Sequence, residues 1–473
     1  MASGTSATFA HAAALTLAAA VGFPACTTHA PRRLPSPAEA TAIATSVQRL
    51  ADPSSRREAA EHAVEIHPKF TLAFVEFDDQ GRLWSRAQLD LLDRTLAAEA
   101  RRPETYGVGI IFFMHGWKHD ADVCDTNVAC FRTYLAQIAA DTEAAAHAAG
   151  TGVKPPRIVG VYAGWRGLSV TVPALRNLSF WSRKKVAERI GAGELIEVLT
   201  HLDQFARDEN ARGRNRAVLN IIGHSFGGTA IYSALANALK ARFVEAFHRR
   251  GRVPVDDNVV QGFGDLVVLV NPAFEASLYA PFEDLLAEFG PFSRRQTPVL
   301  VIVGSESDFP NRTWFRLGRG IDALFQRTGP RSPRKLLTTA VGNYLPFSSH
   351  RLEAAGPSFA NLPLASVSSC ICRLPFAELP FEESQRLGAS IAHLHEGELK
   401  ASEELYERSA CEAGLALGGA HLTCRPGVDP SRPIWHVRAT DDVVHGHSGF
   451  FTRPFLDFLR YVIMDALSKK AVK

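Results

Sequence analysis

Short apolar runs alternate with helical stretches over most of the chain, and this rhythm limits the fold more than any other feature of the sequence. Each run is β-branched and of strand length, which is typical of parallel strands buried on both faces. Strand, helix and strand repeated in this way predict a mostly parallel, doubly wound α/β sheet with helices on both faces. The predicted strands are Val108–Phe113, Arg157–Tyr162, Ala217–Ile222, Leu266–Val270 and Pro298–Val303, and the predicted helical stretches are Val123–Ala149, Arg183–Arg207, Phe226–Phe247 and Ala280–Phe289.

The rhythm is interrupted once, between residues 331 and 433. This stretch contains Pro, Ser and four Cys without a clear period, so we expect a long insertion before the last strand. The alternation resumes with a predicted strand at Ile434–Arg438 and closes with a helix at Arg453–Ala466. The predicted core therefore spans residues 69–330 and 434–473.

The N-terminal residues have the pattern of an export signal. Residues 1–26 contain no charged side chain, and the apolar run Ala12–Phe23 has the length of a signal-peptide core. It ends just before Cys26, in a pattern that resembles a bacterial lipoprotein lipobox. We expect an exported protein of the cell envelope, tethered to a membrane through a lipid on Cys26 or cut elsewhere. Residues 27–68 are rich in Pro, Ser, Ala and Arg, which predicts a flexible tether.

Composition excludes several classes of protein. Of the 473 residues, 46% are hydrophobic and 21% are charged, which are ordinary values for globular proteins. The 52 basic and 49 acidic residues leave a net charge of +3, too small for a dedicated nucleic-acid binder. No apolar stretch of spanning length follows the N-terminus, so a multi-span membrane protein is excluded. The oligomeric state is left open.

Six cysteines besides Cys26 favour disulfides, because an exported chain folds in an oxidising environment. Cys124 and Cys130 are close enough in sequence for a local bridge. The other four lie in one late segment and can pair among themselves: Cys370, Cys372, Cys411 and Cys424. Six cysteines allow fifteen connectivities, so the pairing stays open. Their spacing does not match a zinc ribbon.

The most informative motif is Gly-His-Ser-Phe-Gly-Gly at residues 223–228. A Gly-x-Ser-x-Gly pattern alone is weak, but here a buried strand ends at the motif and a helix begins directly after it. Ser225 is therefore expected on a sharp turn between strand and helix. The glycines permit close approach and unusual backbone angles, and the helix N-terminus favours developing negative charge.

At this motif the chain resembles the α/β-hydrolase superfamily. In that superfamily the serine is the nucleophile, and an acid and then a histidine follow it along the chain. The resemblance points to Asp308 as the acid, with Glu306 as the second choice, because both follow the last predicted strand before the insertion. It points to His447 as the base, on the loop before the final helix, with His445 as a competitor. The His-x-His pair also suggests a metal site, but no third ligand stands at a recognisable spacing.

The same resemblance demands an oxyanion hole after an early strand. Here the run Val108–Phe113 leads into a His-Gly-Trp-Lys segment at residues 115–118. The resemblance implies that the backbone N–H groups of Trp117 and Phe226 hold the oxyanion. Such donors stabilise charge that exists only in the transition state.

Within the superfamily, the chain most resembles a group of uncharacterised bacterial esterase-like proteins. These carry the His-Gly-Trp-Lys segment and a Gly-Trp-Arg-Gly segment after the next strand, found here at residues 164–167. The resemblance covers roughly residues 70–330 and 434–468 and names no substrate.

The expected function is a serine hydrolase that acts on small-molecule or lipid carboxylic esters, without metal or organic cofactor. An acyltransferase with the same acyl-enzyme, and a non-catalytic binding module on the hydrolase fold, are the alternatives. The same triad chemistry can also cleave peptide and amide bonds, but esters are the expected substrates. Residues 167–190 and, less clearly, 331–430 are candidate lids, the first because apolar side chains there are followed by cations. A packed helix with a solvated basic end is the other interpretation of the first segment.

Overall fold

The computed structural model describes residues 30–35, 63–148, 150, 152–168, 179–213, 217–323, 326–356 and 408–471. The residues Met1 to Cys26, with the predicted signal and lipid anchor, lie outside these ranges, as does the part of the insertion that holds Cys370 and Cys372. Among the described helices, none has the length and apolar character needed to cross a membrane.

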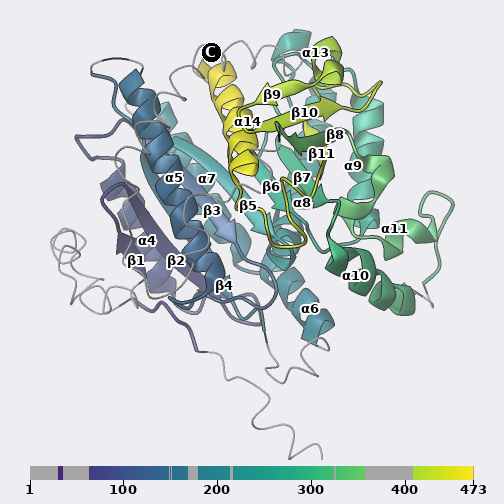
Figure 1. Cartoon of the computed structure of the whole chain (residues 1–473), viewed down its shortest axis with the longest axis horizontal. Helices are drawn as coiled ribbons and strands as arrows, with labels where there is room; N and C mark the ends of the chain where they lie inside the picture. Colours follow the sequence, from purple (N-terminus) through teal and green to yellow (C-terminus); the bar gives the residue numbers. More distant parts are fainter. Residues whose placement is uncertain are drawn as a thin grey trace, which may run out of the picture.

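A single sheet of eleven strands forms the centre of the described structure (Figure 1). The strand order is β1-β2-β4-β3-β5-β6-β7-β11-β8-β10-β9. All pairs from β2 to β8 in this order are parallel, and only β1, β10 and β9 at the two ends pair antiparallel. The strands are β1 Val64–Ile66, β2 Phe70–Phe77, β3 Val108–Met114, β4 Arg157–Trp165, β5 Ala217–His224, β6 Leu266–Val270, β7 Leu300–Ser305, β8 His350–Ala354, β9 Leu415–Leu417, β10 Ala420–Cys424 and β11 Ile434–Ala439. The predicted mostly parallel α/β sheet is thus confirmed.

Helices cover both faces of the sheet because successive strand side chains point to opposite faces. In β2, for example, Ala73 and Val75 join one hydrophobic cluster, whereas Leu72 and Phe74 join the other. Buried side chains of α4, α6, α7, α8 and α9 complete the first cluster, and those of α5 and α14 complete the second. The helices are α4 Arg86–Glu99, α5 Thr126–Ala148, α6 Ser179–Ala192, α7 Leu195–Ala211, α8 Phe226–Arg249, α9 Ala276–Phe289, α10 Phe309–Asp322, α11 Arg334–Thr338, α13 Arg408–Ala413 and α14 Arg453–Ala471.

The predicted helical stretch Arg183–Arg207 is two helices, α6 and α7, rather than one. The break has a tertiary cause. Gly193 packs against the backbone of Gly81, and the N–H of Glu194 donates to the carbonyl of Gly81. The turn after β2 therefore occupies the place where a continuous helix would pass.

The described residues of the predicted insertion extend the sheet. Strands β8, β10 and β9 continue the hydrogen-bonded order beyond β11. A disulfide between Cys411 and Cys424 joins α13 to β10, which agrees with pairing among the late cysteines. The local bridge predicted between Cys124 and Cys130 is wrong, because Cys130 carries a thiol. Cys124 ends a turn before α5, whereas Cys130 lies within that helix.

Two parts of the predicted tether pack against the sheet. Residues 63–68 include strand β1, which pairs with β2. In the stretch 30–35, Arg33 is fully buried, forms an ion pair with Glu65 at 3.0 Å and lies 4.1 Å from the ring centroid of Phe74. Its backbone N–H donates to a carboxylate oxygen of Glu76 at 2.7 Å. These residues therefore belong to the packed structure.

Candidate active site

Ser225 stands at the turn from β5 to α8, at the carboxyl edge of the sheet, where open α/β folds bind their ligands. Its backbone has φ 55° and ψ −117°, a conformation that a residue with a side chain rarely adopts. The chain tolerates it because a glycine lies two residues before it, at Gly223, and another two residues after it, at Gly227. A side chain on Gly227 would collide with the carbonyl oxygen of Met114, so only glycine lets helix α8 pass this close to β3.

Strained backbone gathers around this serine. Among the described residues other than glycine, three have positive φ: Lys118 at 74°, Ser225 at 55° and Asn271 at 45°. Lys118 follows the turn after β3, and Asn271 directly follows β6. Such conformations cost about 1–3 kcal/mol each and persist where the surrounding structure holds them, often at functional sites.

The structure brings Ser225, His447 and Asp308 into one hydrogen-bonded line. The Oγ of Ser225 lies 2.8 Å from Nε2 of His447, and Nδ1 of His447 lies 2.8 Å from Oδ1 of Asp308. The carboxylate can only accept, so Nδ1 carries the proton and the lone pair of Nε2 faces the serine hydroxyl. Ser225 and Asp308 are buried, whereas the His447 side chain keeps 19% of its surface exposed. The arrangement can take a proton from Ser225.

A buried amide holds the acid in place. The NH₂ group of Asn311 donates one hydrogen to Oδ2 of Asp308 at 2.7 Å and the other to the carbonyl of Asn271 at 2.9 Å. The backbone N–H of Asn311 donates to Oδ1 of Asp308 at 3.2 Å. Sequence reasoning missed Asn311, although its place three residues after the acid at the start of α10 was a usable signal.

The histidine is positioned through its own carbonyl. The carbonyl oxygen of His447 accepts from Nδ2 of Asn271 and from Nε2 of His224, each at 2.8 Å. Burial, reinforced by the nearby ring of His447, holds the pKa of His224 well below its usual range. His224 is therefore neutral and keeps the Nε2 proton that it donates. His224 is the last residue of β5 and Asn271 directly follows β6, but sequence reasoning assigned neither of them a role.

The two competing residues lie elsewhere. Nδ1 of His445 bonds to Oδ2 of Asp441 at 2.9 Å, and its side chain is 71% exposed. The carboxylate of Glu306 pairs with Nε of Arg438 at 2.9 Å rather than with His447. Of the predicted candidates, Asp308 and His447 are therefore in line with Ser225, whereas Glu306 and His445 have other partners.

The predicted oxyanion segment passes directly beside Ser225. A side chain on Gly116 would place its Cβ 2.7 Å from Cβ of Ser225, so the turn after β3 and the serine turn are in close contact. Trp117 follows on that turn. Phe226 is the first residue of α8, and its N–H has no acceptor within the helix. Both predicted donors thus belong to the two turns that meet at Ser225.

The Gly-Trp-Arg-Gly segment holds the predicted oxyanion turn. The N–H of Trp165 donates to Nε2 of His115 at 3.1 Å, and its indole Nε1–H donates to the carbonyl of His115 at 3.0 Å. The rings stack at 5.7 Å with an interplanar angle of 8°. Gly167 adds two backbone bonds, to the carbonyl of His119 and from the N–H of Lys118. The two motifs are therefore one structural unit, and His115 acts as support within it.

The Arg of this segment connects the unit to α6. Arg166 and Arg183 both pair with the carboxylate of Asp79, the latter at 2.8 Å. Burial alone would raise the pKa of Asp79, but the hydrogen bonds and charges of the two guanidinium groups lower it. Residues 169–178 of the first predicted lid lie outside the described residues. Its remainder belongs to α6, which packs on α8 through buried apolar side chains.

Aromatic side chains pack against one another next to the turn after β3. Phe180 meets the rings of Trp117 at 5.3 Å, Phe226 at 4.7 Å and Trp181 at 5.2 Å, and Trp181 continues to Phe315 at 5.9 Å. These residues come from the turn after β3, from α6, from α8 and from α10. They form an aromatic wall in which Phe180, Phe226 and Phe315 are buried, whereas Trp117 and Trp181 keep part of their surface exposed.

In the described part of the chain, one group of side chains lies close enough to share a metal ion: His350, Cys411 and Cys424. The two cysteines form a disulfide, so they offer no thiolate there. The group also lies on β8, α13 and β10, whereas Ser225 follows β5. The triad geometry itself contains no metal-ligand set.

Comparison with protein-family models, with curated proteins and with solved structures finds no match for this chain.

Proposed function

We propose that this chain is a serine hydrolase of the α/β-hydrolase type that cleaves carboxylic esters through an acyl-enzyme on Ser225. The observation that carries the proposal is the line from Ser225 through His447 to Asp308, with 2.8 Å at each step. It stands at the carboxyl edge of a mostly parallel sheet, on a strained turn between strand and helix.

The roles follow from the protonation states. His447 takes the hydroxyl proton of Ser225 on Nε2 while the serine oxygen attacks the ester carbonyl. Asp308 stabilises the imidazolium that forms. The Nε2 proton then passes to the leaving alcohol oxygen as the ester C–O bond breaks. Water repeats the sequence on the acyl-enzyme, and the acid is released.

The negative charge of the tetrahedral intermediate would lie at the contact between the two turns. The N–H groups of Trp117 and Phe226 are the proposed donors, and helix α8 begins at the second of them. Removing one donor of this kind typically lowers kcat by a factor of about 10²–10³. The support of the Trp117 turn by His115 and Trp165 keeps this geometry in place before substrate arrives.

The aromatic wall favours an ester with an apolar acyl or alcohol group. Trp117 and Trp181 keep part of their rings exposed, and such surface gains about 25 cal/mol for each Å² of apolar substrate that it covers. We further propose that the protein is exported and held at a bacterial membrane through Cys26. The disulfide between Cys411 and Cys424 supports export, because such bonds persist in oxidising compartments.

The test is intact-mass analysis after treatment with a fluorophosphonate probe. We expect one adduct on the wild-type chain and none on the Ser225→Ala variant. Ser233→Ala, an exposed position on the same helix, is the matched control and should be labelled like the wild type. Absence of an adduct on the folded wild-type chain would put the non-catalytic binding module first.

A panel of p-nitrophenyl esters with increasing acyl chains then tests the substrate class. Repeating it with added alcohols separates hydrolysis from acyl transfer, because transfer yields a new ester in place of the free acid. Hydrolysis is expected to dominate.

A further inference from the structure

A hollow in the surface lies close to Asp308. It encloses about 210 Å³, which is smaller than most pockets for drug-sized ligands and leaves room for a small ion or headgroup. Gly304 and Ser305 at the end of β7 and Arg438 on β11 form one side. Residues of α10, α11 and the short helix η4 (Val341–Asn343) form the other. Asn311 lines this hollow and also donates to Asp308, so the pocket shares a wall with the triad.

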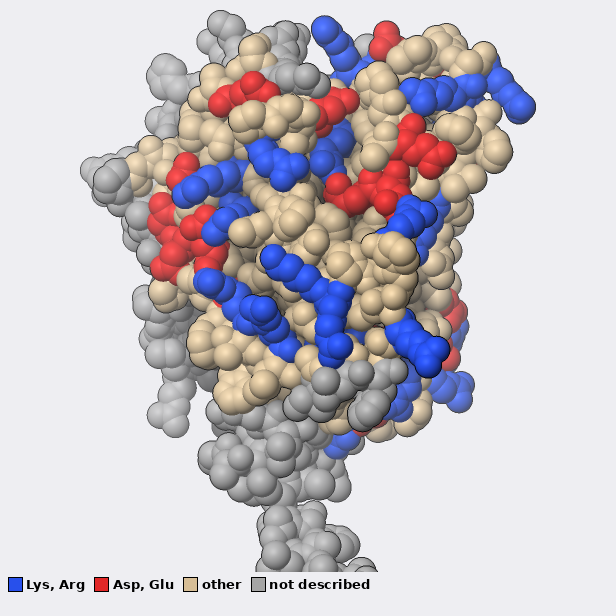
Figure 2. All heavy atoms as spheres, turned by 90° about the vertical axis from the view of Figure 1, so that its right-hand side faces the viewer, with Lys and Arg blue, Asp and Glu red and all other residues tan. Residues whose placement is uncertain are grey.

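The charges of the lining are unbalanced. Four cations line the pocket, Arg312, Arg316, Lys335 and Arg438, against one carboxylate, Glu306. Arg438 already neutralises that carboxylate at 2.9 Å. Three positive charges therefore remain without a compensating acid in the lining. Figure 2 shows Lys and Arg side chains gathered across the middle of the face that lies on the right in Figure 1.

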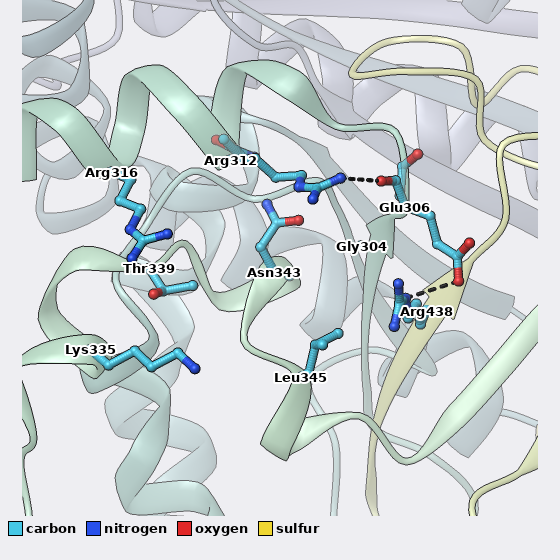
Figure 3. Close-up of a pocket in the computed structure, with 12 residues that line it drawn as sticks. Gly304, Glu306, Arg312, Arg316, Lys335, Thr339, Asn343, Leu345 and Arg438 are labelled. Atoms are coloured by element: carbon cyan, nitrogen blue, oxygen red, sulfur yellow. Dashed lines mark hydrogen bonds and ion pairs between the residues drawn. The ribbon is translucent and has the colours of Figure 1, made fainter.

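The three remaining cations are available to a ligand. In the described structure, the side chains of Arg316 and Lys335 have no hydrogen-bond or ion-pair partner, and Arg312 donates only to the backbone carbonyl of Glu306. In Figure 3, Arg316 and Lys335 project from α10 and α11 on one side, with Asn343 between them and the strand ends. All three side chains are exposed, so water screens part of their mutual repulsion, and a bound anion would lower the rest.

We propose that this pocket binds a phosphate group. A phosphate carries about −1.5 to −2 charges at neutral pH and has three strong acceptor oxygens, which matches three cations better than a carboxylate does. Arg312 and Arg316, at positions i and i+4 of α10, offer planar guanidinium groups, and Lys335 offers a compact ammonium. Asn343 and Thr339 add polar side chains to the lining.

This site is separate from the proposed chemistry. Ser225 directly follows β5 and the pocket lies at the end of β7, two strands away, which corresponds to about 10 Å. The phosphate is either free or the headgroup of a lipid, and both sources offer the same oxygens to the three cations. Ser225 does not line the pocket, so the Ser225→Ala variant should bind phosphate as tightly as the wild type.

Two assays use the full chain. Titration calorimetry measures the binding of inorganic phosphate at constant ionic strength. A sedimentation assay measures binding to phosphatidylcholine vesicles that contain phosphatidic acid. Arg316→Gln and Lys335→Gln should each weaken binding by at least about tenfold. Arg252→Gln is the matched control, because Arg252 is exposed in the turn after α8, at the opposite edge of the sheet, and should leave the Kd unchanged.

Saturable binding of inorganic phosphate with this pattern of variants supports the proposal and shows that free phosphate suffices. Binding of the vesicles alone, with the same pattern, supports it with a lipid headgroup as the source. No binding of either probe, equal binding by all variants, or acetate binding as tight as phosphate overturns it.

A second measurement needs no variant and so does not depend on folding of the substituted chains. Amine acetylation followed by mass spectrometry should show that phosphate slows the modification of Lys335. Lys185, an exposed lysine on α6, is the internal reference and should react at the same rate with and without phosphate. Unprotected Lys335 in saturating phosphate contradicts the site.

Discussion

Replacing Asp308 with asparagine tests the orientation of the triad most directly, because the structure surrounds this carboxylate with donors. Nδ1–H of His447 lies at 2.8 Å, the side-chain amide of Asn311 at 2.7 Å and the backbone N–H of Asn311 at 3.2 Å. Asparagine has the same shape but brings one NH₂ group, which must face one of these donors. If it faces His447, Nδ1 must lose its proton and Nε2 then presents N–H, not a lone pair, to Ser225.

The alternative orientation is opposed by Asn311. Its amide would meet a second NH₂ group, and it cannot turn over freely because the other hydrogen of its own NH₂ group is donated to the carbonyl of Asn271 at 2.9 Å. Either orientation also removes the negative charge that stabilises the imidazolium of His447. We therefore expect kcat to fall by about 10⁴, which corresponds to about 5 kcal/mol of transition-state stabilisation. One unsatisfied buried donor should lower the free energy of unfolding by only about 1–3 kcal/mol.

The assay is hydrolysis of p-nitrophenyl butyrate together with the rate of fluorophosphonate labelling, at a temperature where urea titration shows the variant folded. Asp441→Asn, the same change in the exposed Asp441–His445 pair, is the control and should keep kcat within about threefold of wild type. An Asp308→Asn variant that retains more than about a tenth of the wild-type kcat would refute the assigned tautomer and acid.

A double variant sharpens the argument. Adding Asn311→Asp to Asp308→Asn supplies an acceptor for the new NH₂ group, so the amide oxygen can face Nδ1–H of His447 again. We expect kcat to recover at least about tenfold over Asp308→Asn alone, which corresponds to about 1.4 kcal/mol. No recovery in a folded double variant would show that Asn311 does not control the orientation of residue 308.

Three further predictions concern the supports of the site. Gly116→Ala would place a methyl group 2.7 Å from Cβ of Ser225, so the oxyanion turn must move, and steady-state kinetics should show kcat lower by about 10²–10³. Trp165→Phe leaves the buried carbonyl of His115 without its indole donor at 3.0 Å, and urea unfolding should show a loss of about 1–3 kcal/mol; an unchanged midpoint would mean the bond contributes nothing. Burial lowers the pKa of His436 to about 4, against about 6.5 in the unfolded chain, so the unfolded state binds the extra proton and the free energy of unfolding falls as pH drops from 6.5 to 4. In His436→Gln, the fall between pH 7 and 4.5 should be smaller by about 2 kcal/mol, and equal falls in both chains would contradict this.

The strands and the Ser–Asp–His line could be predicted because their signals are local. A buried parallel strand is a continuous apolar run, and the residues at its carboxyl end meet at one edge whatever the loops do. Ser225, Asp308 and His447 each follow such a run, so the sequence placed them at the same edge. The structure supplied the distances that distinguish the candidates. Asp308 bonds to His447, whereas His445 bonds to Asp441 and Glu306 pairs with Arg438.

The supporting residues could not be predicted in the same way, because their roles depend on contacts between distant segments. Asn271 reaches the carbonyl of His447, 176 residues away in sequence. Arg33 is buried against Glu65 and Phe74, although its surroundings in sequence have the composition of a linker. The Cys124–Cys130 bridge failed for a related reason, since closeness in sequence does not determine where side chains point once Cys130 lies within α5.

The place of β11 in the sheet has a consequence for how the protein is made. Among the described strands, the one that precedes the His447 loop comes last in chain order, yet it lies between β7 and β8 in the interior of the sheet. A chain that stops before residue 434 would therefore expose two parallel strand edges in the middle of the sheet, and such edges pair with other chains. We expect ribosome-released fragments of this length to aggregate or be degraded, and activity to arise only once the complete C-terminal strand and loop have been added.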